Sequence, residues 1–278
     1  MALVRALLRA ATSTLAASGV ASPALDARLL LAHVLEVSPG ALITVTAIAD
    51  PAASDFAALL TRRAAREPLQ HLIGTAPFRY STVRVGPGVF IPRPETELLV
   101  DAVLPRLRTL TTPVVVDLCS GSGALALAIA DEVPAAQVLA VERSPAAVRW
   151  LALNCAGTRV AVRTADITHP AALLDYRGRA DAVLSNPPYV PTATSVGAEV
   201  AHDPPEAVFA GTDGLALMPA VIAAAAELLR SGGVLALEHD WTHGDAVPAL
   251  LHADGRWESV ADHRDLTGRD RYATAVRR

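Results

Sequence analysis

The chain has 278 residues, of which 52% are hydrophobic, and its formal net charge is -4. This composition is sufficient for a buried core, while the small negative charge favours neither a nucleic-acid surface nor a membrane surface. The chain has 24 arginines and no lysine, which excludes Schiff-base chemistry of a lysine and the lysine of a P-loop. Cys119 and Cys155 are too few for a disulfide framework or a zinc site, which indicates a reduced, cytoplasmic environment.

The amino-terminal part of the chain is predicted to form a small bundle of helices. An amphipathic helix is indicated by apolar residues at three- and four-residue spacing: Leu3, Leu7, Leu8, Ala11 and Leu15. Further helices are expected to start at Ser22 and Asp50, because each is an N-cap residue followed by proline, and the second of these is expected to run to Pro68. No catalytic cluster lies in residues 1–75, so this domain is interpreted as either a structural cap or a substrate-docking domain.

The beginning of the chain lacks the pattern of an export signal. Arg9 and the polar residues 12–14 interrupt its apolar stretch before a signal-peptide core can form. No apolar run in the sequence reaches the ~18 residues that a membrane-spanning helix needs. We therefore expect a cytoplasmic protein that has no membrane partner.

After residue 75 the helical spacing gives way to alternation. Residues 76–92 are expected to form a β-hairpin linker with its turn at Gly86-Pro87-Gly88. From residue 93 to residue 278, strands and helices alternate, which predicts an α/β, Rossmann-like domain whose parallel sheet is covered by helices on both faces. The last two strand segments have no helix between them and are expected to pair antiparallel at the end of the sheet.

A glycine-containing loop follows the first strand of this domain, in the segment DLCSGSGALA. Gly121 and Gly123 allow a tight turn and a close approach to a ligand, and the next helix offers its amino end. Glu142 ends the following strand, where its carboxylate can accept hydrogen bonds from two ribose hydroxyls. The loop and Glu142 predict an adenosine site, but the loop also fits the dinucleotide fingerprint, so NAD stays open.

Asp117 favours S-adenosylmethionine over NAD. It lies just before the loop, where a negative charge suits a cationic amino or sulfonium group better than a pyrophosphate. The chain also offers no clear acid or base for hydride transfer. Asp166 is expected to close the third strand and to meet the adenine amino group while Ile167 packs on the ring; the alternative for Asp166 is a turn residue or helix cap.

At this point the motifs resemble those of the protein-(glutamine-N5) methyltransferases that modify class I peptide chain release factors. The resemblance covers nearly the whole chain and is carried by DLCSGSGALALAIA, AVERSPAAV, LSNPPYVP, RSGGVLALEH and the linker from EPLQHLIGTAPFRY to VFIPRPETE. It implies an S-adenosylmethionine-dependent methyltransferase fold, a release factor as the protein partner, and the glutamine of its GGQ motif as the target. The four residues NPPY alone are shared with enzymes that methylate DNA adenine and other planar nitrogens.

The resemblance places catalysis and substrate binding in NPPY, directly after a predicted buried strand. An amide nitrogen is a poor nucleophile, so the site must orient it in line with the methyl group. The Oδ1 atom of Asn186 and the carbonyl of Pro187 can each accept one N–H of the target, while Pro188 adds rigidity and Tyr189 can stack on the amide and exclude water. Neither a metal nor a strong base is required; the alternative for the motif is a rigid surface turn.

The sequence departs from the family pattern at two positions of the cofactor site. Cys119 replaces the first glycine of the loop, and its backbone N–H can bind a ligand only if φ is negative there. Ile167 stands where relatives often have an aromatic residue, which weakens adenine stacking. The residues assigned to the cofactor are Asp117, Cys119, Ser120, Gly121, Ser122, Gly123, Glu142, Asp166, Ile167 and Asn186.

Other functions stay open at this point. A paralogue with a different protein glutamine as its substrate has the same motifs. A nucleic-acid amino-methyltransferase shares NPPY, although the net charge of -4 and the lack of a basic stripe speak against direct nucleic-acid binding. A non-catalytic docking protein that binds S-adenosylmethionine is the third possibility, and a methylation assay with radiolabelled cofactor separates all of these.

Overall fold

The computed structural model describes residues 2–278, the side chains of residues 170–172 excepted. The chain divides into two compact units. The helical unit comprises Met1–Thr75 and the segment Val196–His202, and the sheet unit comprises Ala76–Ser195 and Asp203–Arg278. Nothing in the sequence pattern indicates that Val196–His202 belongs with the helices.

The helical unit is a small bundle with its own core. Its elements are β1 (Ala2–Leu3), α1 (Val4–Ala17), α2 (Pro23–Val34), the 3-10 turn η1 (Ala41–Thr44), β2 (Ala47–Ile48), α3 (Asp50–Ala64), α4 (Leu69–Ile73) and the 3-10 turn η4 (Val200–His202). The short strands β1 and β2 pair antiparallel. Apolar side chains at helical spacing, among them Leu15, Leu31 and Phe56, form the core of this unit.

Two expectations about these helices are wrong in detail. Leu3 does not belong to the buried stripe of α1: it is 65% exposed, and Val4 packs in the core instead, because the chain enters α1 from the β1 strand. The third helix ends at Ala64, short of Pro68. Arg66 has a φ of 69, a left-handed conformation that cannot continue an α-helix.

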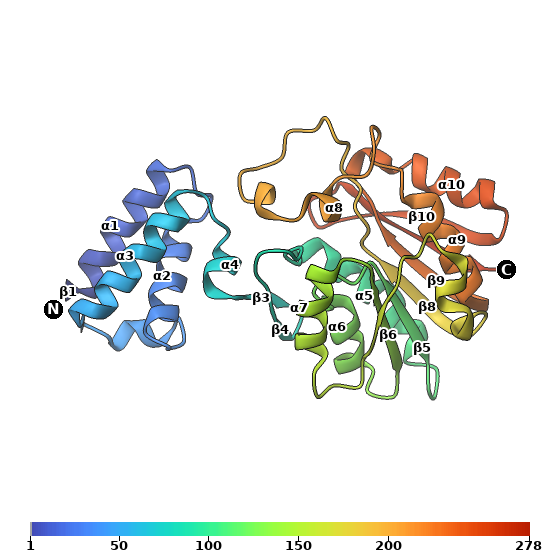
Figure 1. Cartoon of the computed structure of the whole chain (residues 1–278), viewed down its shortest axis with the longest axis horizontal. Helices are drawn as coiled ribbons and strands as arrows, with labels where there is room; N and C mark the ends of the chain where they lie inside the picture. Colours follow the sequence, from blue (N-terminus) through green and yellow to red (C-terminus); the bar gives the residue numbers. More distant parts are fainter. Residues whose placement is uncertain (1) are drawn as a thin grey trace. The chain divides into compact units, whose positions relative to one another are not determined.

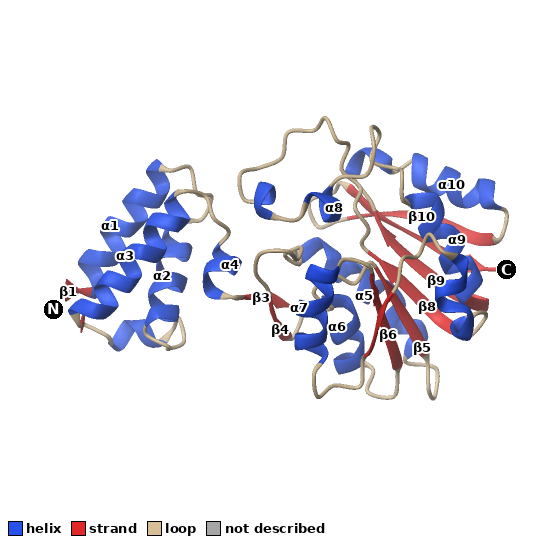
Figure 2. Ribbon diagram, in the orientation of Figure 1, coloured by secondary structure: helices blue, strands red, loops and turns tan. Residues whose placement is uncertain are grey.

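The sheet unit contains, within residues 76–278, a seven-stranded mixed sheet (Figure 2). Its strands are β5 (Val114–Leu118), β6 (Gln137–Glu142), β7 (Ala161–Thr164), β8 (Ala180–Ser185), β9 (Leu229–Glu238), β10 (Trp257–Arg264) and β11 (Asp270–Arg277). They lie in the order β10-β11-β9-β8-β5-β6-β7. The neighbouring strands β9-β8, β8-β5, β5-β6 and β6-β7 are parallel, and β11 pairs antiparallel with both β9 and β10. The predicted α/β class and the antiparallel end of the sheet are confirmed.

Helices cover both faces of this sheet (Figure 1). The helices of this unit are α5 (Glu97–Leu107), α6 (Ala124–Glu132), α7 (Pro145–Cys155), α8 (Pro205–Val208), α9 (Met218–Leu228) and α10 (Ala246–Asp254), with 3-10 turns η2 (Pro94–Thr96), η3 (Pro170–Tyr176) and η5 (Trp241–His243). Of these, α5, α6 and α7 pack on one face of the sheet, and α9 and α10 pack on the other. Val115 of β5 packs with α5, α6 and α7, whereas its neighbour Val116 packs with α9 and α10. Successive strand residues point to opposite faces, so a strand buried on both faces is apolar throughout.

The β-hairpin has a different turn from the one predicted. Strands β3 (Thr75–Phe78) and β4 (Ser81–Arg84) are joined by Arg79-Tyr80, and Arg79 has a φ of 51. The Gly86-Pro87-Gly88 segment follows β4 and precedes no further strand of the hairpin. Arg79 holds the turn against α5 and α6, because its backbone N–H donates to Glu97 Oε1 (2.9 Å) and its guanidinium pairs with Glu132.

Candidate functional site

The predicted site residues collect at the carboxyl ends of the parallel strands. β5 is paired with β6 on one side and β8 on the other, so the loop after β5 lies where the strand order reverses. Ligands of open α/β sheets bind in the crevice at such a point. Glu142 ends β6, Ser185 precedes Asn186 at the end of β8, and Glu238 ends β9.

The loop after β5 is held tightly by local contacts. The Ser120 hydroxyl donates to the backbone carbonyl of Asp117 (2.8 Å) and accepts from the backbone N–H of Val141 (2.9 Å). Gly123 has a φ of 86, and a Cβ there would lie 2.6 Å from Leu151 Cδ1, so the helix α6 can start only from a glycine. These contacts give Ser120 a structural role beside its predicted ligand contact.

Cys119 differs from the expectation in its backbone conformation. Its φ is 60, which is the left-handed region and not the negative value that the sequence interpretation required. Gly121 in the same loop has a φ of 55, so the turn needs left-handed residues at both positions. Desolvation raises the pKa of the Cys119 thiol to about 12, which disfavours the reactive thiolate.

Glu142 binds the backbone of the loop and of the next helix start. Its Oε2 accepts from the N–H of Gly121 (2.9 Å), and its Oε1 accepts from the N–H groups of Arg143 (2.8 Å) and Ser144 (2.7 Å). A carboxylate has about four acceptor positions, so these three bonds leave about one, on Oε2, for a further donor. Glu142 therefore lies against the loop, and its contact with two ribose hydroxyls stays a prediction.

Asp117 is a buried carboxylate with an unsatisfied oxygen. The residue is 1% exposed, and its Oδ2 accepts from the N–H of Ala126 at 3.3 Å. Its Oδ1 has no hydrogen-bond partner within the described part of the chain. Burial raises the pKa of Asp117 to about 7, and the nearby charge of Glu142 adds to this shift. Such a group gains a partner when a cation binds beside it.

Asp166 makes a turn contact, which is the alternative role considered for it, and its contact with adenine stays a prediction. Its Oδ1 accepts from the N–H (2.9 Å) and hydroxyl (2.7 Å) of Thr168, which is a turn contact and lowers the pKa of Asp166. It also lines a cavity of about 510 Å³ together with Arg143, Ser144, Pro145, Thr164, Ala165 and Glu206. Ile167 packs on the core cluster beneath the sheet edge. Glu206, on α8, was not anticipated at this cavity.

The Asn-Pro-Pro-Tyr segment continues directly from the buried strand β8. The side-chain amide of Asn186 donates through Nδ2 to the hydroxyl of Thr96 (3.0 Å), and the Tyr189 hydroxyl donates to Oε1 of Glu238 (2.9 Å). Gly214, with a φ of 79, backs the segment; a Cβ there would lie 2.2 Å from the Tyr189 carbonyl oxygen. Both ends of the motif are therefore fixed by residues from other elements.

Thr96 and Glu238 lie within the sequence motifs, but no role is predicted for either of them from the sequence. Thr96 lies within PRPETE and Glu238 within LALEH, and they are 4% and 0% exposed. Burial raises the pKa of Glu238 to about 7, while the hydroxyls of Thr96 and Tyr189 act in the opposite direction. A buried acid between two strand ends is the signal that sequence reading could have used.

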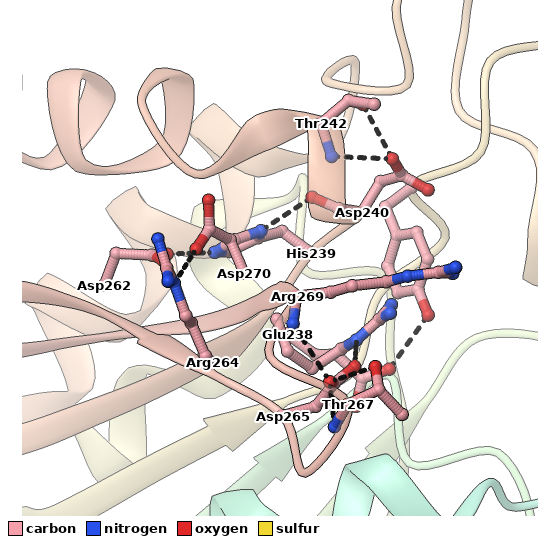
Figure 3. Close-up of polar contacts among 12 residues, drawn as sticks. Glu238, His239, Asp240, Thr242, Asp262, Arg264, Asp265, Thr267, Arg269 and Asp270 are labelled. Carbon is pink, nitrogen blue, oxygen red and sulfur yellow. Dashed lines mark hydrogen bonds and ion pairs between the residues drawn. The ribbon is translucent and has the colours of Figure 1, made fainter.

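Polar contacts continue from Glu238 along β10 and β11 (Figure 3). The next residue, His239, is directed to Asp262, with Nε2 2.7 Å from Oδ1. Arg271 donates through Nε to Asp265 (3.2 Å), and its charge favours the ionised form of Glu238. Asp265 also accepts from the turn residue Thr267 (Figure 3), so the β10–β11 turn is tied to the edge of the site.

The part of the chain that the structure describes shows neither a metal-binding cluster nor a membrane-spanning helix. There, no three His, Cys, Asp or Glu side chains are arranged to hold a metal ion, and no helix has the length and apolar character to cross a membrane. Cys119 and Cys155 are both free thiols.

Comparison with known proteins gives matches along the whole chain. The family model described as the PrmC N-terminal domain matches residues 6–74, and the methyltransferase small domain matches residues 82–240. A release factor glutamine methyltransferase of Mycolicibacterium smegmatis is 50% identical over 280 residues, which cover 100% of this chain and 99% of that protein. A 4-amino-L-phenylalanine/4-methylamino-L-phenylalanine methyltransferase of Streptomyces pristinaespiralis is 40% identical, covering 96% of this chain and 92% of its own.

A solved structure shares a large part of this fold. The 16S rRNA N2 G1207 methyltransferase of T. thermophilus, in complex with AdoMet and guanosine, has a TM-score of 0.53 and 24% sequence identity. The match covers 73% of this chain and 50% of that chain. At this identity the likeness concerns the fold alone.

Proposed function

The chain belongs to the release factor glutamine methyltransferase family, and from this premise we infer its reaction. It transfers a methyl group from S-adenosylmethionine to the side-chain amide nitrogen of a glutamine in a peptide chain release factor. The observation that carries this assignment is a similarity that includes the helical amino-terminal part, since NPPY alone occurs in other amine methyltransferases. We propose the glutamine of a class I factor's GGQ motif as the target.

We propose that S-adenosylmethionine lies against Asp117, the loop of residues 120–123 and Glu142; the backbone N–H of Cys119 is left out, because the φ of this residue is 60. The unsatisfied Oδ1 of Asp117 supports this fit, because a buried carboxylate oxygen without a donor is stabilised by a cation. Oε2 of Glu142 accepts one backbone bond and keeps about one acceptor position for a hydroxyl group. When bound, S-adenosylmethionine supplies a methyl group on a positively charged sulfur. Asp166 and Glu206 line the neighbouring cavity, and we assign the adenine to that side.

The target amide is held by Asn186, Pro187 and Tyr189 in this proposal. Oδ1 of Asn186 and the carbonyl of Pro187 each accept one N–H, which fixes the plane of the amide and aims its nitrogen. Tyr189 covers the amide plane, and its hydroxyl bond to Glu238 limits the movement of the ring. As the new C–N bond forms, the bond between the methyl carbon and the donor sulfur breaks, the sulfur keeps the electron pair and becomes neutral, and the amide nitrogen gives up one proton to water. Positioning in favourable cases supplies on the order of 7–11 kcal/mol of the barrier reduction.

We assign the helical unit, residues 1–75 in the sequence prediction, to docking of the protein substrate. The hairpin region, residues 76–92, links it to the methyltransferase domain, residues 93–278. The helical unit has its own core, formed by residues such as Leu31 and Phe56, and this supports a separate role for it. We also place the protein in the cytoplasm, because release factors act there and both cysteines are free thiols.

A second candidate is methylation of a small aromatic amine. The relative from Streptomyces pristinaespiralis carries such a substrate in its name and aligns over nearly the whole chain. NPPY suits an arylamine as well as an amide, because both nitrogens are conjugated and planar. That relative also aligns over the helical part, so this part does not separate the two substrates. The higher identity to the release factor enzyme of Mycolicibacterium smegmatis, 50% against 40%, favours the protein substrate.

The test of the proposed function is a competition experiment. The enzyme is incubated with S-adenosylmethionine carrying a radiolabelled methyl group, an intact release factor, 4-amino-L-phenylalanine and duplex DNA. We expect label in the release factor, and peptide mass spectrometry should place one methyl group on its GGQ glutamine. Label in the small amine or in the DNA, with an unmodified release factor, would contradict the proposal.

A further inference from the structure

The side-chain amide of Asn186 has two ends with opposite hydrogen-bonding character. Oδ1 accepts hydrogen bonds, whereas Nδ2 donates them. A target NH₂ group offers only N–H donors in the plane of the amide, so it needs Oδ1 and is repelled by Nδ2. In the structure Nδ2 faces the Thr96 hydroxyl at 3.0 Å. Something other than Asn186 itself must keep this orientation, because a rotation of the amide exchanges its ends.

Thr96 can fix the orientation only if its own proton is committed elsewhere. A hydroxyl both donates and accepts, and a free one would bind either end of the Asn186 amide. Glu238 lies beside it: the hydroxyl of Thr96 favours the ionised form of this buried carboxyl. Oε1 of Glu238 accepts from Tyr189, whereas its buried Oε2 has no hydrogen-bond partner within the described residues. An ionised carboxylate therefore has an oxygen available for the Thr96 proton.

We propose that Thr96 and Glu238 are positioning residues: Glu238 orients the Thr96 hydroxyl, and Thr96 in turn holds the Asn186 amide with Oδ1 toward the target. This inference rests on the proposed role of Asn186 in binding the target amide. The direction of donation runs from Asn186 Nδ2 to Thr96 and from Thr96 to Glu238. The same carboxylate anchors Tyr189, so one buried charge fixes both sides of the amide pocket.

The arrangement depends on the charge of Glu238. The groups that act on it are Thr96 and Glu95 from η2, Tyr189 from the motif and Arg271 from β11. Burial and Glu95 raise its pKa, to about 7, while Arg271 lowers it. A protonated Glu238 becomes a donor, and the Thr96 proton is then free to point at Asn186. With saturating S-adenosylmethionine, the methyl-transfer rate should fall as the pH is lowered below about 7.

The test uses the full-length enzyme in single-turnover methylation of an intact release factor. Thr96→Val keeps the shape of the side chain and removes the hydroxyl; we expect a rate ~10²-fold lower, as when one positioned catalytic hydrogen bond is lost. Thr96→Ser should recover most of the rate, because it keeps the hydroxyl. Affinity for S-adenosylmethionine, measured by titration calorimetry, should change little in either variant.

Glu238→Gln provides an independent test of the same inference. Its amide can donate to Thr96, so we expect a slow reaction whose rate no longer changes between about pH 6 and pH 8. Any one of three results would overturn the inference. They are a Thr96→Val enzyme as fast as wild type, a Thr96→Ser enzyme as slow as Thr96→Val, and a pH profile of Glu238→Gln that equals that of wild type. Asn186→Ala distinguishes a failure of this inference from a failure of the proposed function. If Asn186→Ala is slow while Thr96→Val is fast, only the inference about Thr96 fails. If Asn186→Ala is fast, the proposed function of the motif fails.

Discussion

At the scale of a single residue, the proposed contact of Asp117 with S-adenosylmethionine should make cofactor binding depend on pH. Burial holds the pKa of its carboxyl at about 7, so a large fraction of the groups is neutral near pH 7 in the free protein. A cation placed beside Oδ1 favours the charged form and lowers that pKa. Binding of S-adenosylmethionine therefore expels a proton whenever Asp117 starts out protonated.

This gives a prediction with a definite sign. Because the pKa in the free protein is raised, affinity for S-adenosylmethionine should be constant well above pH 7 and weaken as the pH falls through that value, approaching tenfold per pH unit. Asp117→Asn should bind more weakly and lose this pH dependence. Titration calorimetry between about pH 5.5 and pH 8.5 measures both. An identical pH dependence in wild type and Asp117→Asn would assign the effect to another group.

Cys119 carries strain that a glycine would not. A φ of 60 costs an L-residue about 1–2 kcal/mol of strain, which glycine avoids. Glycine in turn destabilises the folded state by about 0.5–1 kcal/mol, because it has more conformational entropy to lose on folding. Cys119→Gly should therefore raise the free energy of unfolding by up to ~1 kcal/mol. Cys119→Ala is the matched control: it removes the thiol but keeps the Cβ, and should give no gain. Urea denaturation checks this, and an equal gain in both variants would mean that strain is not the cause.

At the scale of elements, the loop that follows NPPY is fixed by ion pairs at two points. Glu199 pairs with Arg66 (2.6 Å) and Arg63 (2.9 Å) in the helical unit, and Arg63 also pairs with Asp26 (2.8 Å). The two arginines lower the pKa of Glu199 to about 2. Asp203 is bound inside the sheet unit by Arg93 and by the backbone N–H of Ile91. The chain between these two acids is short, so both pairs restrict the loop.

Removing the Glu199 charge should loosen its segment. Arg63 is 5% exposed, so Glu199→Gln leaves a buried cation with fewer partners, and we expect a loss of ~1–3 kcal/mol in the stability of the helical unit. Glu67→Gln is the control, because it removes an ion pair with Arg62, which is 52% exposed; it should cost less than ~1 kcal/mol. Hydrogen exchange of residues 196–202 should rise in the first variant alone. Equal exchange in both would show that the Glu199 pair does not hold the segment.

The contrast between predicted and observed elements has a physical cause. Strands and helices of the sheet unit follow from local periodicity, which is why their order is confirmed. The hairpin turn is at Arg79 and not at Gly86-Pro87-Gly88, because distant carboxylates such as Glu132 hold an arginine in a left-handed turn that its side chain does not favour. Contacts between residues far apart in sequence leave no local signal.

The site shows the same limit. NPPY and the glycine loop mark its position, but Thr96 and Glu238 meet the motif only after the sheet has formed, at separations of 90 and 49 residues. Nor does the sequence show that a loop cysteine adopts a positive φ, since the conformation is imposed by contacts such as those of Ser120. Each missed feature is a long-range contact or a backbone constraint.

At the scale of the whole molecule, docking and chemistry should separate. A chain of residues 76–278 lacks Arg63 and Arg66, so it should also carry Glu199→Gln to avoid an unpaired carboxylate. We expect it to bind S-adenosylmethionine within a few-fold of wild type and to methylate a short glutamine peptide at a similar rate. Methylation of an intact release factor should fall far more. Equal losses on peptide and protein would refute a docking role for the helical unit.

The central claim is that NPPY holds a release factor glutamine for methylation, and Asn186 tests it most directly. The measurement is single-turnover methyl transfer to an intact release factor with saturating S-adenosylmethionine, comparing wild type with Asn186→Ala. Because Asn186 is proposed to bind the target amide, the variant should keep its cofactor affinity and lose ~10²-fold or more in rate. A variant as fast as wild type, with the methyl group on the same glutamine, would contradict the account.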